Sequence, residues 1–106
     1  MTEESELARW CYACGDLNPI GLHLDFRVED DWAIATFVAL REHQGYPGFV
    51  HGGVLATLAD VALGYATSGS QEPPAHLITV SLTINYSGTT QSVATLNCAC
   101  RASSLP

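Results

Sequence analysis

The stretch from Val50 to Thr67 constrains this chain more than any other part of it. It opens with His51, Gly52 and Gly53 and then becomes almost wholly apolar, with Asp60 as its only charged residue. A helix at a protein surface would show a charged face. We therefore expect a helix that protein covers on nearly all sides, and a carboxylate that must be hydrogen-bonded or used in chemistry.

Composition places the chain in a broad class. Its 106 residues suffice for one small domain, and 47% hydrophobic against 14% charged residues is typical of a folded globular chain with apolar surface to bury between subunits. The net charge is −7, with four arginines and no lysine, which argues against a nucleic-acid partner. The sequence contains no apolar run of about 18 residues that would predict a membrane span. Its acidic start lacks the basic segment of a secretory signal. We expect a cytoplasmic protein without a membrane partner.

Four cysteines, Cys11, Cys14, Cys98 and Cys100, raise the question of a metal or disulfides. Four thiolates can hold zinc, and paired cysteines can staple a secreted domain. The missing signal argues against secretion, and the spacing of Cys98 and Cys100 suits one face of a strand better than a zinc knuckle. We expect ordinary buried or half-buried thiols, no metal and no cofactor.

Residue periodicity predicts an α+β domain over residues 1–106. Alternating apolar and polar residues predict strands over 22–28, 32–40 and 76–86, with a weaker candidate over 92–101. Glu29, Asp30 and Asp31 form a charged hairpin turn, and the glycines and prolines after Ser68 end the helix. We expect an antiparallel sheet that curls around the helix, a flexible terminus over 1–8 and an atypical segment over 88–106.

The central stretch offers two chemical elements. The start of a helix presents unpaired N–H groups, and Gly52 and Gly53 leave them open to a carbonyl oxygen or an anion. Tight packing is the alternative role for the two glycines. Asp60 could act as a general base toward water or as a nucleophile, and a purely structural carboxylate is the alternative.

The spacing within this stretch predicts a dimer. His51 and Asp60 are nine residues apart, which places them about 13 Å apart along a helix and on opposite sides of it. The glycine end and the carboxylate can therefore cooperate only if two helices come together. A two-fold dimer would place Asp60 of one chain near Gly52 and Gly53 of the other.

Several stretches resemble the hotdog-fold acyl-CoA thioesterases, in particular the phenylacetic-acid-degradation (PaaI-like) type. The segment from Cys11 to Leu22 is similar to the family's CxxCGxxNPxGL pattern. The segment from His43 to Gly53, followed by Asp60, is similar to its HQGxPGxVHGG signature with an acid seven residues later. Thr79 to Tyr86 looks like the strand after the helix. The resemblance covers residues 10–87.

The resemblance implies a long helix wrapped by a curved antiparallel sheet, in a homodimer or homotetramer with sites at the dimer interface. It implies Asp60 as the catalytic acid, the Gly52 N–H with Gly53 beside it at the thioester carbonyl, Thr79 at the attacking water, and His51 as an orienting residue. Gln44 or Gly45 stands where relatives carry an asparagine or glutamine. Val54 and Tyr65 are candidates for lining the substrate pocket, although core packing is the alternative role.

The end of the chain departs from this family. After the Asn85-Tyr86 pair, relatives continue into an Arg- and Pro-rich segment and two long strands. In this chain, the residues from Ser87 to the end are mostly small polar residues and cysteines. We therefore expect the sheet to lack its last strand or strands.

We interpret the chain as a metal-free thioester hydrolase that cleaves an acyl- or aryl-CoA thioester to the free acid and CoA. A non-catalytic acyl-CoA-binding module on the same fold is a second interpretation. A hotdog hydratase or dehydratase is a third, but it needs a catalytic histidine and acid at a spacing that His51 and Asp60 do not offer.

Overall fold

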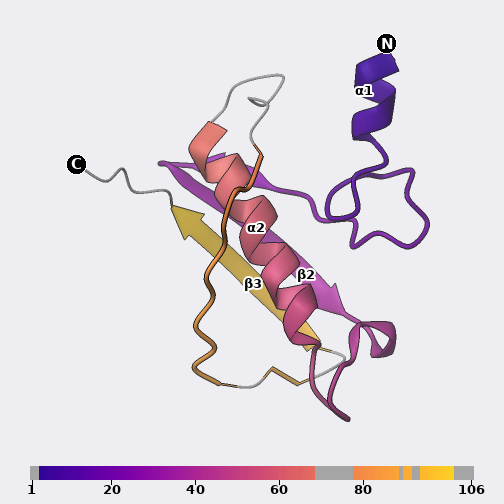
Figure 1. The fold of residues 1–106 in the computed structure, drawn as a ribbon, viewed down its shortest axis with the longest axis vertical. Helices are drawn as coiled ribbons and strands as arrows, with labels where there is room; N and C mark the ends of the chain where they lie inside the picture. The colour runs from indigo at the N-terminus through magenta and orange to yellow at the C-terminus, as the bar shows by residue number, and fades with distance from the viewer. Residues whose placement is uncertain (1–2, 69–77, 89, 92–93, 102–106) are drawn as a thin grey trace.

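The computed structural model describes residues 3–68, 78–88, 90–91 and 94–101. Its elements are α1 (Glu3–Ala8), β1 (Arg27–Glu29), β2 (Trp32–Ala39), a 3-10 turn η1 (Arg41–His43), α2 (Gly52–Ser68) and β3 (Ala94–Arg101). The three strands form one antiparallel sheet in the order β1-β2-β3. Helix α2 lies across one face of this sheet (Figure 1). This arrangement confirms the predicted α+β class.

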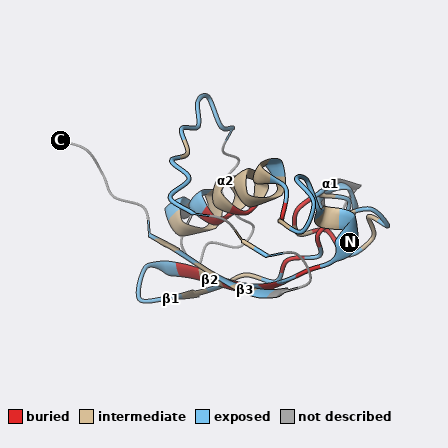
Figure 2. Cartoon of the chain, turned by 90° about the horizontal axis from the view of Figure 1, so that it is seen from below, coloured by how far each residue is buried: buried red, intermediate tan, exposed pale blue. Residues whose placement is uncertain are grey.

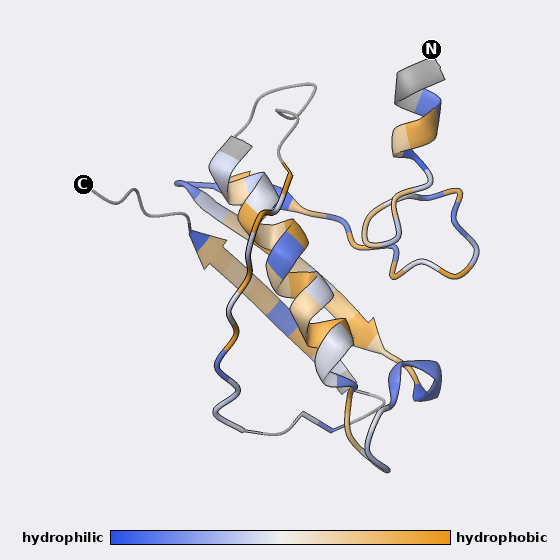
Figure 3. Ribbon diagram, in the orientation of Figure 1, coloured by the Kyte–Doolittle hydropathy of each residue, from blue (hydrophilic) through white to orange (hydrophobic). Residues whose placement is uncertain are grey.

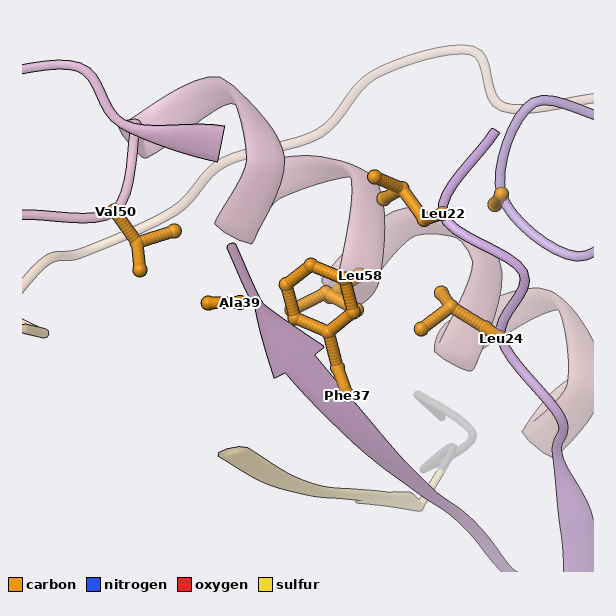
Figure 4. Close-up of a cluster of buried hydrophobic side chains, with 7 residues drawn as sticks. Leu22, Leu24, Phe37, Ala39, Val50 and Leu58 are labelled. Atoms are coloured by element: carbon orange, nitrogen blue, oxygen red, sulfur yellow. The ribbon is translucent and has the colours of Figure 1, made fainter. Parts of the chain in front are cut away.

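The sheet packs against α2 through the alternate residues of β2. Ala33, Ala35, Phe37 and Ala39 are buried, while their neighbours along the strand are half-buried or exposed. The small alanines let the helix approach the sheet, and Phe37 fills the space beside Leu58 of α2 (Figure 4). Alternation of this kind is what the sequence predicted for residues 32–40.

The first predicted strand is only partly a strand. Its buried residues are where the alternation placed them, because Leu22 and Leu24 are both core residues. However, the N–H groups of Leu22 and Leu24 donate to the carbonyls of Tyr12 and Ala13 in the preceding loop, and only Arg27–Glu29 pairs with β2. The hairpin turn is as predicted, with Asp30 and Asp31 both at positive φ (49° and 68°), as a two-residue turn between twisted strands requires.

The segment predicted as a strand over 76–86 was assigned wrongly in its described part. Residues 78–87 are extended but belong to no strand, and they lie along the face of α2 that points away from the sheet (Figures 1 and 2). Residues 76 and 77 lie outside the described part of the chain. By contrast, the weaker candidate over 92–101 is confirmed, since Ala94–Arg101 pairs with the whole of β2.

Helix α2 is less enclosed than its composition predicts. Figure 3 shows it coloured as hydrophobic over most of its length, yet within residues 52–67 only Leu58 and Ala62 are buried, and Leu63 is 38% exposed. The expectation of cover on nearly all sides is therefore wrong for the single chain, because the sheet covers one face instead of curling around the helix. The terminus expected to be flexible contains the short helix α1.

Candidate active site

A groove of about 890 Å³ runs beside the second half of α2. The N-terminal loop forms one wall, and the extended segment from Ile78 to Leu82 forms another. Asp60 and Thr79, two of the predicted site residues, line this groove together. Tyr65, predicted as a substrate-binding residue, also lines it.

The Thr79 hydroxyl donates a hydrogen bond of 2.5 Å to Oδ1 of Asp60. Asp60 is half-buried and Thr79 is exposed. Among the described residues, no other side chain or N–H group bonds to the Asp60 carboxylate, so its Oδ2 has no hydrogen-bond partner there. A half-buried carboxylate with one oxygen anchored and the other open can accept a proton from a water molecule.

The start of α2 leaves one donor open. The Gly53 N–H donates to Nδ1 of His51 (2.8 Å), and the N–H groups of Val54 and Leu55 donate to the His51 carbonyl (3.0 and 3.2 Å). The Gly52 N–H has no acceptor among the described residues. A bond from Gly53 to Nδ1 places the proton of a neutral His51 ring on Nε2. The helix start therefore presents the Gly52 N–H and, beside it, a histidine that can donate from Nε2.

The loop before α2 fixes His51. The His51 N–H donates to the His43 carbonyl (2.8 Å), and the His43 ring packs on Phe37 with centroids 5.0 Å apart. A Cβ at Gly45 would lie 2.9 Å from the His51 ring, so a glycine is needed for this close approach. Gln44 uses its Oε1 to accept the Gly48 N–H (2.9 Å). In this structure Gln44 and Gly45 shape the loop around His51.

The two halves of the predicted site are not brought together within one chain. Gly52 and Asp60 are eight residues apart on α2, which corresponds to about 12 Å along the axis. A thioester carbonyl on the Gly52 N–H is therefore too far from the carboxylate of the same chain for a water to bridge the two. The predicted pocket residue Val54 packs against the hydrophobic core.

Tyr65 connects the helix to the N-terminal loop. Its ring stacks on Phe26 with centroids 5.0 Å apart, and its hydroxyl donates to Sγ of Cys14 (3.5 Å). Burial, followed by the contact with Cys14, raises the pKa of Tyr65 above its ordinary value, so the hydroxyl keeps its proton as a donor.

Sequence reasoning gave no site role to two features of this region. Tyr86 donates its hydroxyl to the Gly52 carbonyl (2.7 Å) and so connects the extended segment to the helix start. Cys11 and Cys14 line the same groove as Asp60. The CxxC spacing was a usable signal for the second feature, but alternation alone could not show what the Tyr86 hydroxyl would contact. Within the described ranges, no three or more His, Cys, Asp or Glu side chains gather closely enough to hold a metal ion.

An apolar helix that carries one carboxylate and begins with two glycines, packed on an antiparallel sheet, is a hotdog-type α+β arrangement, of which the described residues contain three strands. The sequence model described as "Thioesterase superfamily" matches residues 47–105, more than half of the chain. The chain belongs to this superfamily.

Two relatives fit this assignment. The chain is 50% identical over 54 residues to "Putative esterase PA0474" of Pseudomonas aeruginosa, across 48% of this chain and 40% of that protein. It is 44% identical over 43 residues to "Acyl-coenzyme A thioesterase THEM4" of Bos taurus, across 41% of this chain and 16% of that protein. The chain thus spans less than half the length of each of these relatives. No solved structure is significantly similar to it, and no helix in the described ranges has the length and apolarity to cross a membrane.

Proposed function

We propose that this chain hydrolyses acyl- or aryl-CoA thioesters, with Asp60 as the general base. The observation that carries the proposal is the hydrogen bond between Thr79 and Asp60 on the wall of a groove large enough for an acyl chain. Membership of the thioesterase superfamily supports thioester hydrolysis in general. The name of the bovine relative supports a coenzyme A ester as the substrate class.

In this mechanism the open Oδ2 of Asp60 takes a proton from a water molecule while the water oxygen bonds to the thioester carbon. Thr79 donates to Oδ1, which holds the carboxylate in place, and its oxygen can accept a hydrogen bond from the same water. The carbonyl oxygen gains negative charge and receives a hydrogen bond from the Gly52 N–H, with His51 Nε2 as a neighbouring donor. The carbon–sulfur bond then breaks, and the proton held by Asp60 passes to the thiolate that leaves.

The proposed reaction needs two chains. The open Gly52 N–H and the Asp60 carboxylate are about 12 Å apart on one helix, and a homodimer would place one from each chain at a shared site. The extended segment that carries Thr79 supports such pairing, because Ile78 and Val80 are 88% and 96% exposed in the single chain. An exposed apolar edge of this kind is a template for another chain. A homotetramer would join two such dimers.

The same distance favours a second candidate function. A single chain has the groove and one catalytic group but lacks the carbonyl donor beside it, so a monomer would bind an acyl-CoA without cleaving it. The oligomeric state separates the two candidates. Analytical ultracentrifugation should find a dimer or tetramer in the active sample, and full hydrolytic activity in a strictly monomeric sample would rule out the shared site.

Asp60→Asn tests the base directly. It removes the proton acceptor but keeps the shape, so we expect the hydrolysis of a panel of acyl- and aryl-CoA substrates to fall by about 10²- to 10⁴-fold. Asp30→Asn is the matched control, because Asp30 lies in the hairpin turn where asparagine is also favoured. The proposal fails if Asp60→Asn turns over substrate at the rate of the control while both variants show the same circular dichroism spectrum.

A further inference from the structure

The N-terminal loop brings two thiols together on the groove wall. The Gly15 N–H donates to the Cys11 carbonyl (2.9 Å), which closes residues 11–15 into one helical turn. Residues three apart in such a turn have α-carbons about 5 Å apart, within the range of about 4.4–6.8 Å that a disulfide spans. The Cys11 and Cys14 side chains lie near enough for each to shift the pKa of the other. A Cβ at Gly15 would lie 2.3 Å from the Arg9 carbonyl oxygen, so the turn depends on this glycine.

The surroundings give the two thiols different roles. Burial by itself would raise the pKa of Cys11, but hydrogen bonds from the Cys14 backbone and thiol, and from Ala13 and Gly15, outweigh it and lower the pKa. Burial dominates at Cys14 and raises its pKa, although the hydrogen bond from Tyr65 acts in the opposite direction. A thiolate is the attacking species in disulfide exchange, so Cys11 is suited to attack first and Cys14 to follow.

Cys98 and Cys100 provide a contrast within the same chain. Both are half-buried on β3, and burial raises the pKa of each. Two residues apart on a strand, their α-carbons are about 6.6 Å apart, near the upper limit that a disulfide spans, and no turn draws their side chains together. These two thiols report how an ordinary half-buried cysteine of this protein reacts.

We propose that Cys11 and Cys14 form a thiol–disulfide exchange site that takes low-molecular-weight disulfides from the groove. The Cys11 thiolate attacks one sulfur of the small disulfide, which forms a mixed disulfide and releases the first small thiolate. The Cys14 thiol, after loss of its proton to solvent, attacks the Cys11 sulfur and releases the second. The protein dithiol is oxidised to a disulfide and the small disulfide is reduced to two thiols. This exchange does not depend on thioester hydrolysis.

Tyr65 is a positioning residue in this scheme. Its hydroxyl donates to Cys14 Sγ and favours the thiolate form of the resolving thiol. Tyr65→Phe keeps the stack on Phe26 and removes only this hydrogen bond. The second step should then slow by about threefold or more, and the mixed disulfide on Cys11 should accumulate to a level not seen in the wild type.

Peptide mapping tests the proposal. The full chain is reduced, freed of reductant under argon, exposed to glutathione disulfide for increasing times and alkylated with iodoacetamide. We expect an internal disulfide between Cys11 and Cys14 to form at least about tenfold faster than any adduct on Cys98 or Cys100. In the Cys14→Ser variant the reaction should stop at one glutathione adduct on Cys11. In urea, the faster reaction of Cys11 and Cys14 over Cys98 and Cys100 should vanish.

Two results would overturn the proposal. One is equal reaction of all four cysteines in the folded chain, because the turn would then confer no reactivity. The other is a stable glutathione adduct on Cys11 in the wild type, because Cys14 would then not act as the resolving thiol. Neither result would touch the proposed hydrolysis, which the Asp60 variants test separately.

Discussion

The two faces of α2 are held by different forces. Toward the sheet, Leu58 and Ala62 are buried, and β2 is paired with β3 along its whole length. Toward the outside, the extended segment is connected to the helix by two hydroxyl groups, Thr79 on Asp60 and Tyr86 on the Gly52 carbonyl (Figure 2 shows this side as largely exposed). The candidate site lies on this second face. The scaffold is thus built by packing, and the chemistry is placed where few contacts hold the chain.

The largest effect on stability should come from the sheet side. Phe37→Ala removes the largest buried ring of the core and its contact with His43, so we expect the free energy of unfolding to fall by about 3–5 kcal/mol. Urea denaturation followed by circular dichroism measures this change. Val38→Ala, one residue along the same strand but 57% exposed, should change it by less than about 0.5 kcal/mol. Similar losses in both variants would show that packing on α2 does not hold the scaffold.

On the outer face, an effect on chemistry should appear without a comparable effect on stability. Thr79→Val keeps the shape of the side chain but removes the donor to Asp60, and hydrogen bonds to charged groups contribute about 1.5–3 kcal/mol. We expect kcat for a CoA thioester to fall at least about tenfold. Thr79→Ser, which keeps the hydroxyl, should retain most of the activity. An unchanged kcat in the valine variant would remove Thr79 from the proposed mechanism.

The sequence predicted the sheet side of the molecule better than the outer side. The alternation of residues 32–40 and the apolar run after His51 determine burial directly, so β2 and α2 begin and end close to where we expected them. Alternation also predicted a strand over 76–86. Alternation shows which side chains share a face, but it does not show whether another strand has a free edge to pair with. Strand β3 occupies one edge of β2 along its whole length, β1 pairs with Trp32–Ile34 on the other edge, and residues 78–87 lie along the helix instead of joining the sheet.

The candidate site follows the same division. Asp60 and Thr79 were expected together, and the structure joins them by a hydrogen bond. The sequence could not show which of the two glycine N–H groups, that of Gly52 or that of Gly53, lacks an acceptor. The answer depends on the His51 ring, which turns its Nδ1 to the Gly53 N–H. The role of Tyr86 depends likewise on where the extended segment ends against the helix. Side-chain rotation and loop path decide these contacts, and residue patterns encode neither.

The smallest effect should come from the second hydroxyl on the outer face. Tyr86→Phe removes the hydrogen bond to the Gly52 carbonyl but keeps the ring, which is 53% exposed, so we expect a loss of only about 0.5–1 kcal/mol. Amide hydrogen exchange should show the loss locally, as faster exchange at the start of α2 with the amides of β2 unchanged. Tyr46→Phe, at an 81% exposed ring, is the control and should change neither. Equal acceleration in β2 would mean that the two faces of α2 open together, and the extended segment would then belong to the scaffold.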